Sequence, residues 1–173
     1  MRRILVLALA ACGADPAVPG DAATAAIVLG TVASDGTGFE PMTGDQPLIP
    51  GAQGGFHVWL KYRVAGIAPG TVRVVRTVRR VADGRLILMT DGAQDIGAAG
   101  TDGWWELPAP VPSFMCPAPL GVRVNDELVR FDVTLVDPTS GATLVEGTAD
   151  ATPRCPADGD QAAHCLAICD ETS

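Results

Sequence analysis

The segment "GGFHVWLKYRVAGI", residues 54–67, carries the clearest fold signal in the chain. Hydrophobic side chains recur there at every second position, at Phe56, Val58, Leu60, Tyr62 and Val64. A period of two is typical of a half-buried β-strand, because successive side chains point to opposite faces. The segment therefore predicts a strand whose Phe56 face lies in a core. His57, Trp59 and Lys61 are expected on the outward face.

Two hairpins are predicted around this strand. The β-branched segments 71–81 and 85–90 flank Ala82-Asp83-Gly84, and the segments 128–137 and 142–152 flank Pro138-Thr139-Ser140-Gly141. Such residues are typical of tight turns. Shorter strands are expected at 25–33, 46–50 and 104–108. A loop is expected at 91–103, and a proline-rich connector that cannot be an interior strand is expected at 108–121.

Composition indicates the same fold class. Of the 173 residues, 47% are hydrophobic and only 5% are aromatic, and 20 Gly and 14 Pro favour short strands joined by many turns. We expect an all-β fold, an antiparallel immunoglobulin- or fibronectin-like sandwich of about seven strands spanning residues 25–155. A small barrel is the alternative. The net charge of −8 argues against a nucleic-acid partner.

The amino terminus has the pattern of an export signal. Arg2 and Arg3 precede eight apolar residues, 4–11, which are too few to span a bilayer. The sequence Leu9-Ala10-Ala11-Cys12 resembles the lipobox of bacterial lipoprotein precursors. The resemblance implies that residues 1–11 are removed and that Cys12 becomes the lipidated first residue. An ordinary secretory signal with a chance cysteine is the alternative.

The lipobox resemblance also implies a location. Gly13, rather than Asp, follows Cys12, which favours the outer membrane of a bacterial envelope. Loss of the signal leaves 10 basic against 20 acidic side chains. Residues 12–24 are expected to be a flexible tether. The segment "GAQGGFHVWLKYRV", residues 51–64, resembles the first long core strand of uncharacterised bacterial lipoproteins with an immunoglobulin-like domain. This resemblance implies no particular activity.

Four cysteines remain besides Cys12, an even number that favours two disulfides in an exported protein. The expected pairs are Cys116–Cys155, across the closing hairpin, and Cys165–Cys169, which a helix would place about 6 Å apart in the tail 156–173. One or two helical turns are expected in that tail. The competing reading is a Cys₃His metal site at Cys155, His164, Cys165 and Cys169.

Arginines cluster on the first hairpin, at Arg73, Arg76, Arg79, Arg80 and Arg85. A guanidinium matches phosphate or carboxylate oxygens, so Arg73, Arg76 and Arg79 are candidates for an anion site. The alternative is that these charges protect a sheet edge and pair with surface aspartates.

Tryptophans are the other candidate binding residues. Trp104 and Trp105 are adjacent in a strand, so one should lie in the core and the other outside. The outer one, like Trp59, could stack on a sugar ring or a protein partner. His57, with only His164 as a second histidine, is expected to be a surface or hydrogen-bonded residue.

These features predict an envelope lipoprotein whose sandwich binds or packs without catalysis, cofactor or metal, with an envelope protein or a glycan as the possible partner. A carbohydrate-active or hydrolytic enzyme using Asp95, Asp102 and Glu106 is one alternative. A metal or redox protein using Cys155, Cys165 and Cys169 is another. A calcium site at Asp91, Asp95 and Asp102 is a further alternative, although the EF-hand order of acidic residues is absent.

Overall fold

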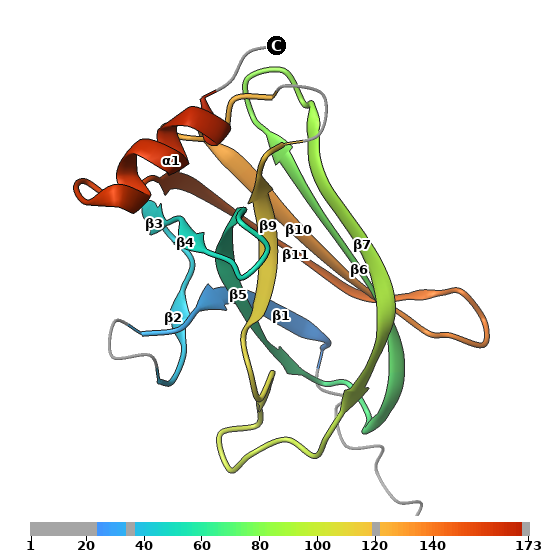
Figure 1. Ribbon diagram of the computed structural model, residues 1–173. Coiled ribbons are helices and arrows are strands. Elements are labelled where there is room, and N and C mark those ends of the chain that lie inside the picture. Colours follow the sequence, from blue (N-terminus) through green and yellow to red (C-terminus); the bar gives the residue numbers. More distant parts are fainter. Residues whose placement is uncertain (1–23, 34–36, 119–121, 171–173) are drawn as a thin grey trace, which may run out of the picture.

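The computed structural model describes residues 24–33, 37–118 and 122–170, which form two packed β-sheets and one helix (Figure 1). The first sheet has the strand order β2-β1-β5-β4, and β8 and β9 also pair with β5. Its strands are β1 (Ala26–Thr31), β2 (Glu40–Pro41), β4 (Ile49–Pro50), β5 (Phe56–Ala65), β8 (Trp105–Glu106) and β9 (Val111–Cys116).

The second sheet has the order β3-β11-β10-β6-β7. Its strands are β3 (Asp45–Pro47), β6 (Gly70–Arg80), β7 (Leu86–Ile96), β10 (Val129–Val136) and β11 (Thr143–Arg154). The β3–β11 ladder is parallel and the other ladders are antiparallel. The predicted all-β sandwich is therefore confirmed. In the described part of the chain, no helix has the length and hydrophobicity needed to cross a membrane.

β5 lies at the centre of the first sheet and confirms the two-residue period. The five side chains expected in the core are each at most 2% exposed. The outward face differs from expectation, because His57 and Lys61 are each only 5% exposed. Trp59 and Phe114 pack against the His57 ring, and Gly38 and Glu106 bind the Lys61 ammonium group. Both faces of β5 are therefore covered.

Both predicted hairpins are present as β6–β7 and β10–β11. β7 continues to Ile96, so the expectation of a loop is wrong for residues 91–96, whereas residues 97–103 lie outside any strand or helix. The strand continues because β6 already begins at Gly70, which supplies ladder partners as far as Ile96.

The proline-rich connector contains β9, which sequence reasoning did not expect. β9 pairs with β5 on one side only, with Pro112 opposite Trp59. Proline lacks a backbone N–H, so it is tolerated on an edge strand that needs hydrogen bonds on one side. The expectation that this segment is not an interior strand is consistent with that position.

The two sheets approach closely where β1 meets β11. A Cβ atom at Gly147 would lie 2.6 Å from Ile27 Cγ2, so only glycine fits without a shift. β9 lies at the edge of the first sheet and β7 at the edge of the second. A cavity lined by residues of both sheets lies between them.

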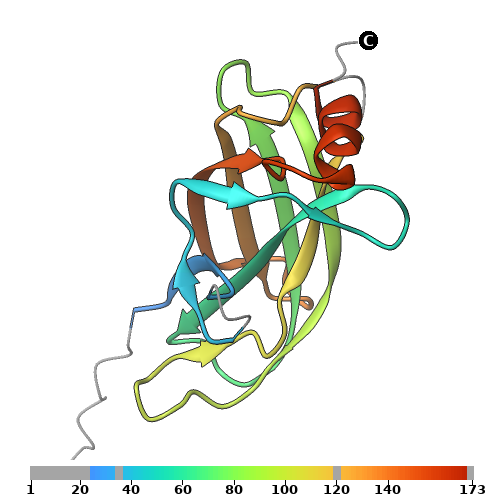
Figure 2. The ribbon, with the colours of Figure 1, turned by 60° about the vertical axis from the view of Figure 1, so that its left-hand side comes forward.

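Helix α1 (Asp160–Cys169) caps one end of the sandwich (Figures 1 and 2). Its buried residues are Ala162, Cys165 and Cys169, and the Val124 N–H donates to the Cys169 carbonyl at 3.0 Å. The expected short helix in the tail is confirmed. Its packing places two cysteines against the ends of both sheets.

Candidate functional site

Arg76 occupies a position on β6 that its neighbours use for the core. Val72, Val74 and Val78, which share its side of the strand, are buried, and Arg76 itself is half-buried. Because side chains at i and i+2 share a face, the guanidinium is carried between the two sheets. This is an unusual place for a charged side chain.

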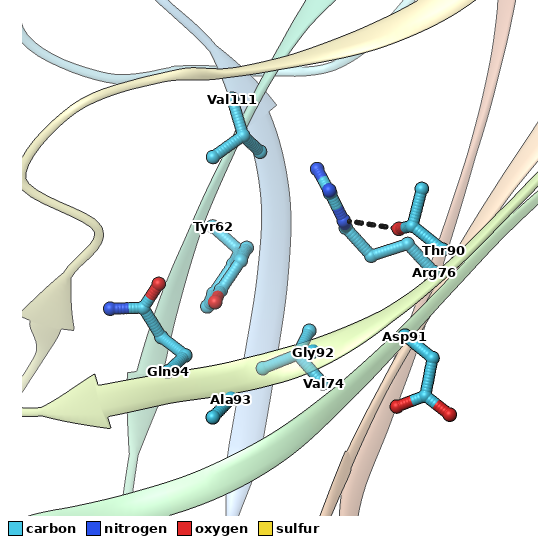
Figure 3. Close-up of a pocket in the computed structure, with 9 residues that line it drawn as sticks. All are labelled: Tyr62, Val74, Arg76, Thr90, Asp91, Gly92, Ala93, Gln94 and Val111. Atoms are coloured by element: carbon cyan, nitrogen blue, oxygen red, sulfur yellow. Dashed lines mark hydrogen bonds between the residues drawn. The ribbon is translucent and has the colours of Figure 1, made fainter.

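Arg76 lines a cavity of about 110 Å³. One water needs roughly 10–15 Å³ on a comparable measure, so the space admits several waters or a small ion. Tyr62 and Val111 contribute one wall from the first sheet (Figure 3). The second sheet contributes Val74, Arg76, Thr90, Asp91, Gly92, Ala93 and Gln94. The cavity reaches the surface, because several of these β7 residues are exposed.

The guanidinium is incompletely paired. Its Nε donates to Thr90 Oγ1 at 2.9 Å, whereas Nη1 is buried without a hydrogen-bond partner. No carboxylate among the described residues forms an ion pair with Arg76. Desolvation by burial lowers the pKa of Arg76, yet guanidinium groups remain charged at any ordinary pH. Arg76 therefore lines the cavity as a cation with one unpaired donor.

Tyr62 adds a neutral hydroxyl to the same site. Its side chain is buried, and burial raises its pKa to about 12, against the opposing effect of the Arg76 charge. The phenol therefore stays protonated at neutral pH and can donate a hydrogen bond. Asp91 does not neutralise the site, since its carboxylate turns away from Arg76 (Figure 3) and pairs with Arg73.

The arginines of the first hairpin have separate partners. Arg73 pairs with Asp91, Arg80 pairs with Asp83, and Arg79 Nη1 donates to the Gly84 carbonyl at 3.2 Å. Pairing with nearby aspartates, the alternative raised from the sequence, holds for Arg73 and Arg80. Arg76 differs because it points to the opposite face of β6 from Arg73 and Arg79. The sequence does contain a signal for this difference. Arg76 is an even number of residues from Val72 and Val74, so in a strand it shares their buried face.

The tryptophans separate into different environments. Trp105 lies in the core, with its ring centroid 6.2 Å from that of Tyr62, and Trp104 is half-buried. The expectation that one of this adjacent pair is a core residue is confirmed.

Trp59 lines a second cavity, of about 320 Å³, together with Glu40, Asp45 and Gln46. Gln46 is 6% exposed, and its amide nitrogen donates to the Thr43 carbonyl at 3.0 Å. Its Oε1 is buried without a partner. Gln46 therefore lines this cavity and carries an unpaired acceptor.

The carboxylates considered for catalysis are each engaged separately. Asp95 accepts from Thr71 Oγ1 at 2.6 Å, and Asp102 accepts from the Trp104 N–H at 3.2 Å. Glu106 pairs with Lys61 and Arg63. In the described ranges these acids do not gather into a cluster that could hold a metal ion, and the same holds for the calcium set that adds Asp91.

Cysteine pairing differs from expectation. The disulfides are Cys116–Cys169, with Cα atoms 5.2 Å apart, and Cys155–Cys165, with Cα atoms 5.7 Å apart. The expected pairs Cys116–Cys155 and Cys165–Cys169 are wrong, because α1 folds back between the ends of β9 and β11 and turns its two cysteines toward different strands. His164 Nε2 lies 3.0 Å from the Gly54 carbonyl oxygen, so a Cys₃His site does not form.

Comparisons with known proteins assign no family to the chain: no protein-family model and no curated protein matches it. A solved structure that is similar in part is a calcium-binding mutant of Bacteroides uniformis beta-glucuronidase 2, at 13% sequence identity and a TM-score of 0.41. The match covers 73% of this chain and 13% of that chain, so this chain spans only a small part of its length.

Proposed function

We propose that this protein is a lipid-anchored, non-enzymatic binding module of a bacterial cell envelope, and that the Arg76 cavity holds a small anionic group of its ligand. The lipobox resemblance at Cys12, which lies outside the described residues, supports the anchor. The two disulfides support an oxidising compartment, because cytosolic thiols are kept reduced.

One observation carries the proposed ligand chemistry: Arg76 lines a cavity, and its Nη1 is buried and has no partner. Leaving a charged donor unsatisfied costs free energy, which a bound anion would recover. A carboxylate or a phosphate group offers oxygens that match the guanidinium fork. Tyr62 and Thr90 line the same cavity and carry hydroxyls that can donate to an anion, and the Thr90 hydroxyl already accepts from Arg76 Nε.

Thermal denaturation with sodium acetate and with sodium phosphate tests this proposal and separates the two anions. A ligand present at a hundred times its Kd stabilises the folded state by about 2.7 kcal/mol, a shift of several degrees in Tm. We expect one or both anions to raise Tm beyond sodium chloride of equal ionic strength, and Arg76→Gln to abolish the increment. Arg73→Gln, on the exposed side of the same strand, is the control and should retain it. Equal shifts in the wild type and Arg76→Gln would reject the site.

The anchor is tested independently in the native host. Intact-mass measurement of the membrane fraction should find a chain that begins at an acylated Cys12. Cys12→Ser should leave residues 1–11 uncleaved and unacylated. An unmodified Cys12 in the mature wild-type protein would reject lipidation while leaving the Arg76 site open to its own test.

The Trp59 cavity favours a second candidate, binding of a glycan. Its volume of about 320 Å³ lies at the lower end of the range for small-molecule sites, roughly 300–1,000 Å³. An indole face suits the apolar side of a sugar ring, and Gln46 Oε1 can accept from a sugar hydroxyl. Titration with neutral disaccharides should quench tryptophan fluorescence in the wild type and not in Trp59→Phe combined with Gln46→Leu. Quenching that survives this change would place the sugar elsewhere.

A further inference from the structure

The two disulfides connect α1 to both sheets. Cys116 ends β9 in the first sheet, and Cys155 follows directly on β11 in the second sheet. Their partners, Cys169 and Cys165, lie one helical turn apart on the buried face of α1. Figure 1 shows the helix over this end of the sandwich. Each bond therefore fastens the same helix to a different layer.

The sulfur atoms of these two bonds are close to one another. Cys165 Sγ and Cys169 Sγ, which belong to different disulfides, are 3.6 Å apart. The sulfurs of Cys155, Cys165 and Cys169 all lie within 4.8 Å of one another. Thiol–disulfide exchange needs a thiolate to reach one sulfur of a neighbouring disulfide, so this spacing permits transfer between the two bonds.

Access to the cluster is limited to one side. Cys116, Cys165 and Cys169 are at most 3% exposed, whereas Cys155 is half-buried. Cys155 also lines a cavity of about 460 Å³, with Arg154 and Pro156 beside it and the segment 45–50 opposite. A thiol reagent that enters this cavity meets Cys155 before any other sulfur of the cluster.

We propose that the cluster is a thiol–disulfide exchange site that accepts a dithiol at Cys155 and passes the exchange inward to Cys169. A thiolate of the dithiol attacks Cys155 Sγ, a mixed disulfide forms, and Cys165 leaves as a thiolate. The Cys165 thiolate attacks Cys169 Sγ, a Cys165–Cys169 disulfide forms, and Cys116 leaves and takes up a proton. The second thiol of the dithiol closes on its own mixed disulfide and releases Cys155 as a thiol.

The net reaction oxidises one dithiol to a cyclic disulfide and reduces the protein by two electrons. The product holds thiols at Cys116 and Cys155 and one disulfide within α1. Cysteines at i and i+4 of a helix have Cα atoms about 6 Å apart, within the range that a disulfide spans. One pair of reducing equivalents therefore breaks both disulfide links between α1 and the sheets. Apart from the backbone that joins it to β11, the helix is then held by packing and by hydrogen bonds, including that from Val124.

Peptide mapping after limited reduction tests the proposal on the full chain. The protein, purified without reductant, is treated with one equivalent of dithiothreitol, trapped with N-ethylmaleimide and analysed by mass spectrometry. We expect the label on Cys116 and Cys155 and an internal disulfide in the peptide that holds Cys165 and Cys169. Label on Cys155 and Cys165 with Cys116–Cys169 intact would overturn the exchange step, and absence of label would overturn access at Cys155.

A matched variant separates exchange from simple reduction. Cys116→Ser with Cys169→Ser retains the Cys155–Cys165 bond and removes the internal acceptor. In this variant the label should fall on Cys155 and Cys165, and circular dichroism before reduction checks that the domain has folded. Label on Cys155 and Cys165 in both proteins would contradict the proposed transfer. This experiment tests the exchange site separately from the proposed anion site, because no cysteine lines the Arg76 cavity.

Discussion

Lys61 and Glu106 form an ion pair on the outer face of the first sheet, joining β5 to β8. Lys61 Nζ also donates to the Gly38 carbonyl at 2.8 Å, and Arg63 Nε donates to the second oxygen of Glu106 at 2.8 Å. Burial raises the pKa of Glu106, but the hydrogen bonds and charges of Lys61 and Arg63 outweigh it and hold that pKa below its usual value. The carboxylate is therefore ionised and satisfies a buried cation.

Glu106→Gln should destabilise the protein, because it leaves the buried Lys61 ammonium without its counter-charge. We expect a loss of about 2 kcal/mol in the free energy of unfolding measured with urea, less than for a fully buried pair because Glu106 is partly exposed. Asp150→Asn, which breaks the exposed pair with Arg130, is the control and should cost at most about 1 kcal/mol. Equal losses would show that burial of Lys61 is unimportant.

Arg76→Met should leave the protein as stable as the wild type or more so, by about 1 kcal/mol. The substitution removes a half-buried cation that has no counter-charge and keeps an unbranched side chain of similar length. The urea midpoint in a buffer of chloride alone measures the effect. A clear loss of stability would indicate that the guanidinium is part of the fold rather than a group held for a ligand.

His57 should make stability fall as the pH drops below its usual pKa of 6.5. Desolvation lowers its pKa from the usual 6.5, and neither ring nitrogen has a partner among the described residues. Because the unfolded chain then binds a proton more readily, stability is complete above the unfolded pKa and falls as pH drops below it, by at most about 1.4 kcal/mol per pH unit. His57→Phe should flatten this slope, and His164→Gln should retain it. A slope unchanged in His57→Phe would assign it to another group.

Gly147→Ala should weaken the contact between the two sheets. The added Cβ would lie 2.6 Å from Ile27 Cγ2, so the side chain or the strands must shift. Overpacking of this kind costs roughly 1–3 kcal/mol. Ile27→Ala removes the Cγ2 atom, so Gly147→Ala should lower the urea midpoint less in an Ile27→Ala background than in the wild type. Full wild-type stability of Gly147→Ala alone would contradict the close approach.

Sequence patterns predict the fold well where the determinants are local. The alternation in 54–67 and the turn residues at 82–84 and 138–141 identify β5 and both hairpins. β9 was missed because its prolines hide a strand that needs hydrogen bonds on one side only. The buried state of His57 and Lys61 was missed because Phe114, Gly38 and Glu106, which contact them, are distant in sequence.

The candidate site was only partly predictable for the same reason. Arg76 was named among several arginines, and strand parity could have separated it from Arg73. The wall that Tyr62 and Val111 provide depends on how the two sheets meet, which no local pattern encodes. Cysteine pairing likewise depends on where α1 packs.

The most direct test of the central claim follows the side chain of Arg76 itself. In a ¹H–¹⁵N NMR titration with acetate and with phosphate, the Nε–H signal that disappears in Arg76→Gln should shift progressively and saturate, while that of Arg73 stays in place. An Arg76 signal that does not move with either anion, or that moves only in step with Arg73 and with sodium chloride, would contradict anion binding in the cavity.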